Sequence, residues 1–233
     1  MKIEELKKRY GEEYPAAVIC EGARMPLQRE SRFARHYHSE ERKMGTRISG
    51  FMDGSASVTV EELRNDWSSW TERERNDFCQ ESCWLHEQSD FPDMLRFIMA
   101  NGRPGDWSGI ALSVGSCLPK DEAFELLLRA LQATDLGSTS NLTQGIALTK
   151  HPSAESTLRR HLQSIWSKPA LWDDDKFLNW LAFDATTCIS HLIELGASVP
   201  DLEEQVRQLA QHTCSHNRDS CRNFLSKYYS WLK

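Results

Sequence analysis

The sequence predicts an all-α protein made of stacked antiparallel helix pairs. Apolar residues recur at three- and four-residue spacing from Val58 onward, which is the period of a helix with one buried face. Helix start and stop signals bracket these segments, and one short segment recurs further along the chain. The chain has 233 residues, of which 39% are hydrophobic and 27% are charged. This length and composition allow a sizeable core and exclude a wholly disordered chain.

The first 56 residues lack the helical period. Residues 1–50 carry 11 Lys and Arg against 8 Asp and Glu, whereas the whole chain has a formal charge of -6. Apolar residues are sparse between Cys20 and Gly54 and follow neither the helical nor the strand period. We therefore predict an irregular N-terminal arm with a short helix over residues 1–56, and a helical repeat domain over residues 57–233.

Short polar side chains mark where the first helices begin. Thr59 with Glu62, and Thr71 with Glu74, have the spacing of a capping box, in which each side chain accepts from the backbone N–H of the other residue. Such caps satisfy the N–H groups that the first turn of a helix leaves without partners. Glycine-containing turns then predict helix ends at residues 101–105 and 135–137.

One four-residue segment occurs twice. Gly109–Leu112, with the sequence Gly-Ile-Ala-Leu, recurs 36 residues later as Gly145–Leu148. Each copy is followed by a proline and an amphipathic helix, and a long helix predicted over residues 177–195 is followed by the same signal. The prolines are Pro119, Pro152 and Pro200. Aligning the helices behind them places Phe124, Leu158 and Val206 at equivalent positions.

Over residues 89–232 the sequence resembles HEAT-like helical repeat proteins. The resemblance implies a right-handed α-solenoid, in which each helix pair buries the apolar strip that its neighbour leaves exposed. Small residues in the helices of neighbouring pairs would allow the close approach that such stacking requires. These residues are Gly109, Ala111, Gly145, Ala147, Ala182 and Ala185.

The sequence contains no motif of a known catalytic site: a Walker loop, a Gly-x-Ser-x-Gly segment and a His-Glu-x-x-His segment are all missing. Repeat folds commonly bind other proteins along the concave surface formed by their second helices. We therefore predict a non-enzymatic scaffold or adaptor that binds another protein, with small inhibitor or immunity proteins as a sub-class. The predicted contact residues are Glu125, Arg129, Arg159 and Arg207 on aligned helices, with Gln163 and Gln211 one turn after the last two, and Trp107 and Trp172 in inter-helix turns.

An enzymatic alternative also comes from a resemblance. DNA glycosylases that remove alkylated bases are built from HEAT-like repeats at about this length, and they use tryptophans and an aspartate that face a basic groove. Trp107, Trp180 and Asp184 are similar to that set. The net charge of residues 57–233 is negative, however, and phosphate contacts normally dominate DNA affinity, so nucleic acid is the less favoured partner.

Two groups of metal-ligand residues are present. Cys79, Cys83 and His86 span about 10 Å of helix rise, too far for all three to bind one ion, and core packing is the favoured interpretation of the cysteines. The second group matches no standard zinc finger, and we predict no metal or cofactor while leaving zinc open there. Its members are His212, Cys214, His216 and Cys221. The acidic run at residues 173–175 is predicted to cap the next helix.

The cellular location is predicted from composition. The seven cysteines are an odd number with irregular spacing, which favours reduced thiols over a disulfide framework. The chain begins with a charged segment, and its longest apolar runs are far shorter than a membrane span. We therefore expect a cytoplasmic protein without a membrane segment.

Overall fold

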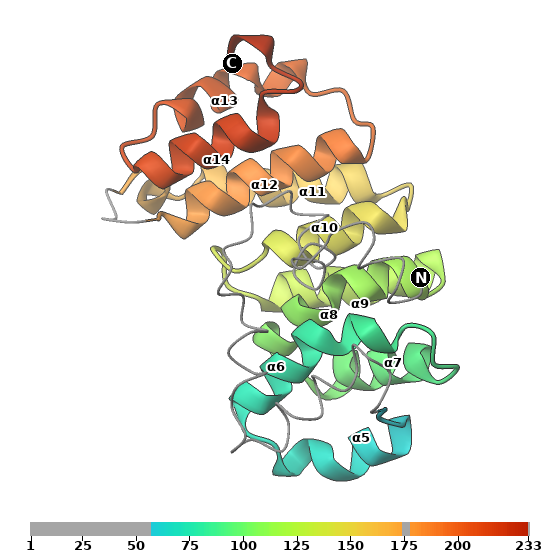
Figure 1. The fold of residues 1–233 in the computed structure, drawn as a ribbon. Coiled ribbons are helices and arrows are strands. Elements are labelled where there is room, and N and C mark those ends of the chain that lie inside the picture. The colour runs from blue at the N-terminus through green and yellow to red at the C-terminus, as the bar shows by residue number, and fades with distance from the viewer. Residues whose placement is uncertain (1–56, 174–177, 233) are drawn as a thin grey trace, which may run out of the picture. The chain divides into compact units, whose positions relative to one another are not determined.

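The computed structural model describes residues 57–173 and 178–232, and these residues form ten α-helices, several short 3₁₀ helices and no strand (Figure 1). The all-α prediction is thus confirmed for this part of the chain. The chain divides into two compact units, residues 1–110 and residues 111–233, and the boundary lies inside one helix. The predicted arm over residues 1–56 lies outside the described residues.

The N-terminal unit contains α5 (Val60–Asp66), α6 (Glu72–Glu81), α7 (Phe91–Asn101) and the first half of α8 (Pro104–Cys117). Both predicted capping boxes are present at the starts of α5 and α6. Thr59 accepts from the Glu62 N–H at 3.2 Å, and the Glu62 carboxylate accepts from the Thr59 N–H at 2.8 Å. Helix α5 packs against α7, and Leu63 and Leu95 from these two helices are fully buried.

The C-terminal unit contains the second half of α8 and six further helices. These are α9 (Lys120–Ala133), α10 (Ser140–Thr149), α11 (Ala154–Trp166), α12 (Trp180–Glu194), α13 (Glu203–Ala210) and α14 (Ser215–Leu225). Helix α10 packs on α9, α11 and α12, and α12 packs in turn on α11 and α14 (Figure 1). This packing of successive helices is compatible with a helical repeat.

The repeated segments lie where two helices cross at very short distance. A Cβ atom added to Gly145 of α10 would lie 2.5 Å from the carbonyl oxygen of Ala111 in α8, and one added to Gly115 would meet the carbonyl oxygen of Gly145. In the N-terminal unit, a Cβ at Gly109 would lie 2.8 Å from the Cys79 Cβ of α6. The predicted close approach is thus confirmed for these helices, and the aligned residues Phe124, Leu158 and Val206 are all buried.

The longest helix differs from the prediction at its N-terminus. Helix α12 begins at Trp180, and its N-cap is Asn179, whose side chain accepts from the Ala182 N–H at 3.1 Å. The interpretation of the acidic run as the cap is therefore wrong for Asp173, because an uncharged side chain nearer the helix supplies the acceptor; residues 174–177 lie outside the described residues. Trp180 is 58% exposed, although in the sequence its spacing puts it on the apolar stripe of this helix.

No helix of the described part of the chain combines the length and the hydropathy needed to cross a bilayer.

Candidate functional site

The structure places three of the predicted contact residues on open helix surfaces of the C-terminal unit. Glu125 and Arg129 of α9 are exposed, and so is Arg207 of α13. Gln163 of α11 and Gln211, which follows α13, are exposed as well. Their role in binding stays a prediction.

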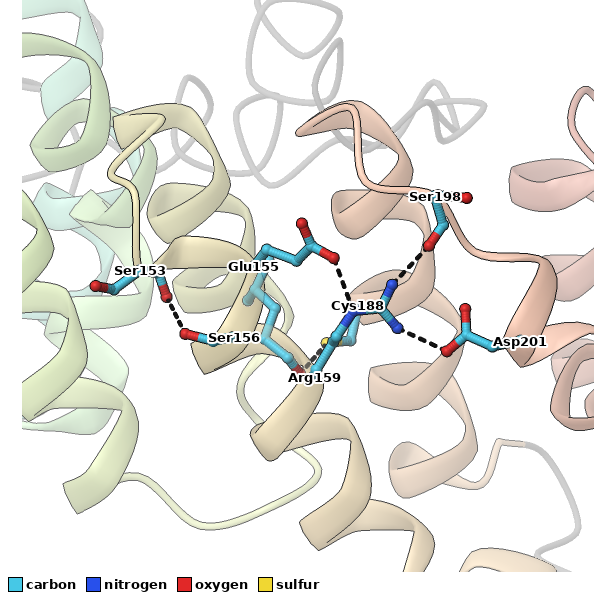
Figure 2. Close-up of polar contacts among 8 residues, drawn as sticks. Ser153, Glu155, Ser156, Arg159, Cys188, Ser198 and Asp201 are labelled. Carbon is cyan, nitrogen blue, oxygen red and sulfur yellow. Dashed lines mark hydrogen bonds and ion pairs between the residues drawn. The ribbon is translucent and has the colours of Figure 1, made fainter.

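Arg159 of α11 is held by three contacts inside the C-terminal unit (Figure 2). Its Nε donates to Glu155 at 2.9 Å, and its two terminal nitrogens donate to the Asp201 carboxylate at 2.9 Å and to the Ser198 carbonyl at 2.6 Å. The hydrogen bond that Arg159 donates to the Glu155 carboxylate is the main reason that the pKa of the Arg159 guanidinium is raised. The side chain thus fastens α11 to the segment that precedes α13.

We expect Arg159→Ala to lower the free energy of unfolding by about 1 kcal/mol, because the ion pairs are partly exposed to solvent. Arg160 is the matched control, since it is exposed on the same helix and makes no side-chain hydrogen bond or ion pair within the described residues. Urea unfolding of both variants measures the difference. Equal stability of the two variants would contradict the fastening role.

The two predicted tryptophan contacts have different surroundings. Trp107 is not in a turn: α8 begins at Pro104, so Trp107 lies in its first turn, partly buried, with its indole nitrogen enclosed. The helix starts there because proline is favoured at the first helical position. Trp172 does lie between helices, at the end of a 3₁₀ helix, and is 39% exposed. Its ring packs edge-on against Trp166 and stacks on His212.

A pocket lies at the end of the C-terminal unit, and the sequence did not predict it. It has a volume of about 370 Å³ and is lined by Ala210 of α13, Arg222 of α14, and Trp231 and Leu232 of a final 3₁₀ helix (Ser230–Leu232). We call it the C-terminal pocket; Figure 1 shows α13 and α14 side by side near the C-terminus. One feature of the sequence could have pointed to this region. Arg218 and Arg222 are like charges one turn apart on α14, and such a pair destabilises a helix, so it calls for another explanation.

Asp184 of α12 is enclosed rather than open to a ligand. It is 1% exposed, and its Oδ2 atom accepts from the backbone N–H groups of Gly137 at 2.9 Å and Thr139 at 3.0 Å, and from the Thr139 hydroxyl. The Thr139 hydroxyl in turn lies 2.9 Å from His161 Nε2. Because that hydroxyl donates to Asp184, it accepts from His161, so the His161 proton is on Nε2.

A second buried histidine, His191, lies on α12, the helix that also carries Asp184. The Thr143 hydroxyl donates to the Ser140 carbonyl at 2.8 Å and therefore accepts from His191 Nδ1 at 2.9 Å. Burial lowers the pKa of His161 to about 4 and that of His191 to about 3. Both side chains are therefore neutral at pH 7. Burial raises the pKa of the Asp184 carboxyl, against the opposing effect of its hydrogen bonds.

These shifts predict that the protein loses stability as the pH falls from 7.5 to 5. The unfolded chain takes up protons on both histidines near pH 6.5 while the folded chain does not, so stability is present above pH 6.5 and is lost toward the folded pKa values. Asp184 acts in the opposite direction, because its raised pKa favours the folded state in acid. Each histidine is expected to contribute about 2 kcal/mol of loss between these pH values, and the opposing effect of Asp184 reduces the sum.

Urea unfolding at both pH values measures this loss. The change of stability with pH should shrink in His161→Gln and in His191→Gln, and it should persist in His86→Gln, because His86 is exposed. An unchanged pH dependence in both of the first two variants would contradict the buried, neutral state of these histidines.

The two groups of metal-ligand residues are engaged in local packing. His212 Nδ1 accepts from the Cys214 N–H at 3.0 Å, and its Nε2 donates to the Leu171 carbonyl at 2.9 Å. The Cys221 thiol faces the Val206 carbonyl, while Cys79 is buried in the N-terminal unit. Burial raises the pKa of both thiols. Among residues 57–173 and 178–232, no group of three or more His, Cys, Asp or Glu is placed to hold a metal ion.

Comparison of the chain with protein-family models, with curated proteins and with solved structures gives no match.

Proposed function

We propose that this chain is a non-enzymatic scaffold that binds another protein in the cytoplasm. In this proposal the helices form a right-handed, HEAT-like α-solenoid, and the partner contacts the C-terminal unit. An inhibitor or immunity protein is the sub-class to which a small chain with a negative net charge is suited.

The observation that carries the proposal is a set of large, solvent-exposed aromatic side chains. Trp180 is 58% exposed, Tyr228 44%, Trp172 39% and Trp231 37%, all in the C-terminal unit. Aromatic side chains are the commonest binding hot spots, because a rigid ring buries much apolar area and its polar atom can still form a hydrogen bond. Exposed rings on a helical scaffold therefore favour a protein interface.

The solenoid form is supported by the helix crossings. Helices α8 and α10 approach so closely near the repeated segments that a Cβ added at Gly115 would meet the backbone of Gly145, and one added at Gly145 would meet that of Ala111. Helix α10 also packs on α12, and α12 packs on α14. Every second helix of the C-terminal unit therefore packs on the next, and these helices form a layer. Alternation of this kind is expected for stacked helix pairs.

A DNA glycosylase gains no support from the candidate aspartate. Asp184 would have to reach an extruded base, yet its carboxylate is enclosed by the turn before α10 and binds two backbone N–H groups there. Trp107 belongs to the N-terminal unit, and Trp180 and Asp184 belong to the C-terminal unit.

The proposal is tested by affinity capture from an extract of the native cells, with quantitative mass spectrometry. The full chain is compared with a Trp180→Ser/Tyr228→Ser variant, and Arg160→Ala serves as the surface control. We expect at least one protein to be retained by the wild type and the control and to be depleted about tenfold by the aromatic variant, which corresponds to the loss of one hot spot. Equal retention by all three, or release of alkylated bases from duplex DNA, would overturn the proposal.

A further inference from the structure

Among its described lining residues, the C-terminal pocket combines one cation with an aromatic wall and an apolar floor. The cation is Arg222, the wall is Trp231, and the floor is formed by Ala210 and Leu232. Its volume of about 370 Å³ is near the lower end of the range for pockets that hold small ligands. The pocket is therefore large enough for one or two side chains and too small for a helix.

The Arg222 guanidinium has no acceptor in the described part of the protein. It makes no side-chain hydrogen bond there and no ion pair within 4 Å, although Asp219 lies one turn earlier on α14. Arg218, one turn away on the same face, donates to the carbonyls of His212 and Thr213, which are uncharged, and it forms no ion pair with a residue of 57–173 or 178–232. This end of α14 thus presents positive charge that no ion pair among the described residues neutralises.

The aromatic wall is held in place before any ligand arrives. The Arg207 guanidinium lies 4.2 Å from the centre of the Trp231 ring, and Glu203 binds the same guanidinium. Tyr229 packs against Trp231, and its hydroxyl donates to the Val199 carbonyl at 2.7 Å, which anchors the final segment to the segment that precedes α13. A wall fixed in this way loses little conformational entropy on binding.

We infer that the C-terminal pocket binds an acidic side chain, with its apolar neighbour, from an extended segment of the partner protein. The Arg222 guanidinium would bind the carboxylate of a Glu or Asp, and the neighbouring apolar side chain would pack on Trp231 and Leu232. The inference rests on the proposed function and names the chemistry of the partner. A phosphate group fits less well, because phosphate sites usually gather several donors, whereas the described lining of this pocket offers one guanidinium beside apolar surface.

The test uses the full chain and the capped peptide acetyl-Ser-Gly-Glu-Leu-Gly-Ser-amide. Binding is followed by the NMR signal of the Trp231 indole N–H, assigned with a Trp231→Phe variant. We expect a saturable shift of this signal, and about tenfold weaker binding when Glu in the peptide is replaced by Gln, as expected for loss of a charge-assisted hydrogen bond. Arg222→Gln should weaken binding of the Glu peptide by a similar factor, and Arg160→Gln should leave it unchanged.

Three outcomes would overturn the inference: no shift up to the solubility limit of the peptide, equal binding of the Glu and Gln peptides, or a larger shift with inorganic phosphate than with the Glu peptide. A melting curve of Arg222→Gln that matches the wild type shows that the variant is folded. Affinity capture separates this inference from the proposed function. A partner retained equally by the wild type and Arg222→Gln would leave the scaffold proposal standing and reject the pocket.

Discussion

Gly115→Ala is expected to destabilise the protein by about 3 kcal/mol or more. A methyl group at this position of α8 would overlap the backbone carbonyl oxygen of Gly145 in α10, and backbone atoms cannot move aside as a flexible side chain can. The two helices would have to separate, and the buried contacts along their crossing would be lost. The crossing lies within the C-terminal unit, so thermal and urea unfolding of the full chain report the effect.

Close packing and helix propensity predict opposite effects of Gly115→Ala on stability. Alanine is a better helix former than glycine by about 1 kcal/mol, so helix propensity alone would stabilise the variant. Ser116→Ala is the control, because Ser116 is the next residue of α8 and is exposed. Its stability should change by about 0.5 kcal/mol or less. A Gly115→Ala protein as stable as the wild type would show that the close crossing is not required.

Asp184→Ala is expected to lower the free energy of unfolding by about 3 to 5 kcal/mol. The substitution leaves the backbone N–H groups of Gly137 and Thr139 and the Thr139 hydroxyl without their acceptor in a buried turn. Gly137 has a φ of 97°, in the left-handed region that favours glycine, and the carboxylate fixes the turn that this residue makes before α10. The loss therefore includes both the hydrogen bonds and the geometry of the turn.

Asp184→Asn is the matched variant for this prediction. Its amide oxygen can still accept from the two backbone N–H groups, so we expect it to keep most of the stability that Asp184→Ala loses. Urea unfolding at pH 7.5 compares the two variants, and hydrogen exchange of the Thr139 amide gives a local measure. Equal stability of Asp184→Ala and the wild type would contradict the structural role and would reopen a catalytic one.

The local signals in the sequence predicted the helices well. The capping boxes at Thr59 and Thr71 join residues three positions apart, so they can be identified without knowledge of the tertiary fold. The repeated segment predicted the close crossing at Gly145, because a small residue that recurs at the period of a helix pair has packing as its simplest explanation. The apolar period predicted the buried positions Leu158 and Val206.

Features that depend on long-range contacts were missed or misplaced. Trp180 lies on the apolar stripe by spacing, yet it is exposed, because periodicity shows which residues share a helix face and not how far a neighbouring helix covers that face. Asp184 resembled a catalytic group until the structure showed its acceptor role toward Gly137, 47 residues earlier in the chain. Arg159 resembled a free contact residue, although Asp201 holds it from 42 residues away.

The sequence by itself therefore determined the helical class, the main helix starts and the recurring small residues, because each follows from interactions within a few residues or from a simple period. Only the tertiary structure decided which polar side chains are enclosed and which face solvent. It also assembled the C-terminal pocket, whose lining residues come from α13, α14 and the final 3₁₀ helix. Such a pocket has no local signature, since its residues meet only when the apolar faces of separate helices are buried against one another.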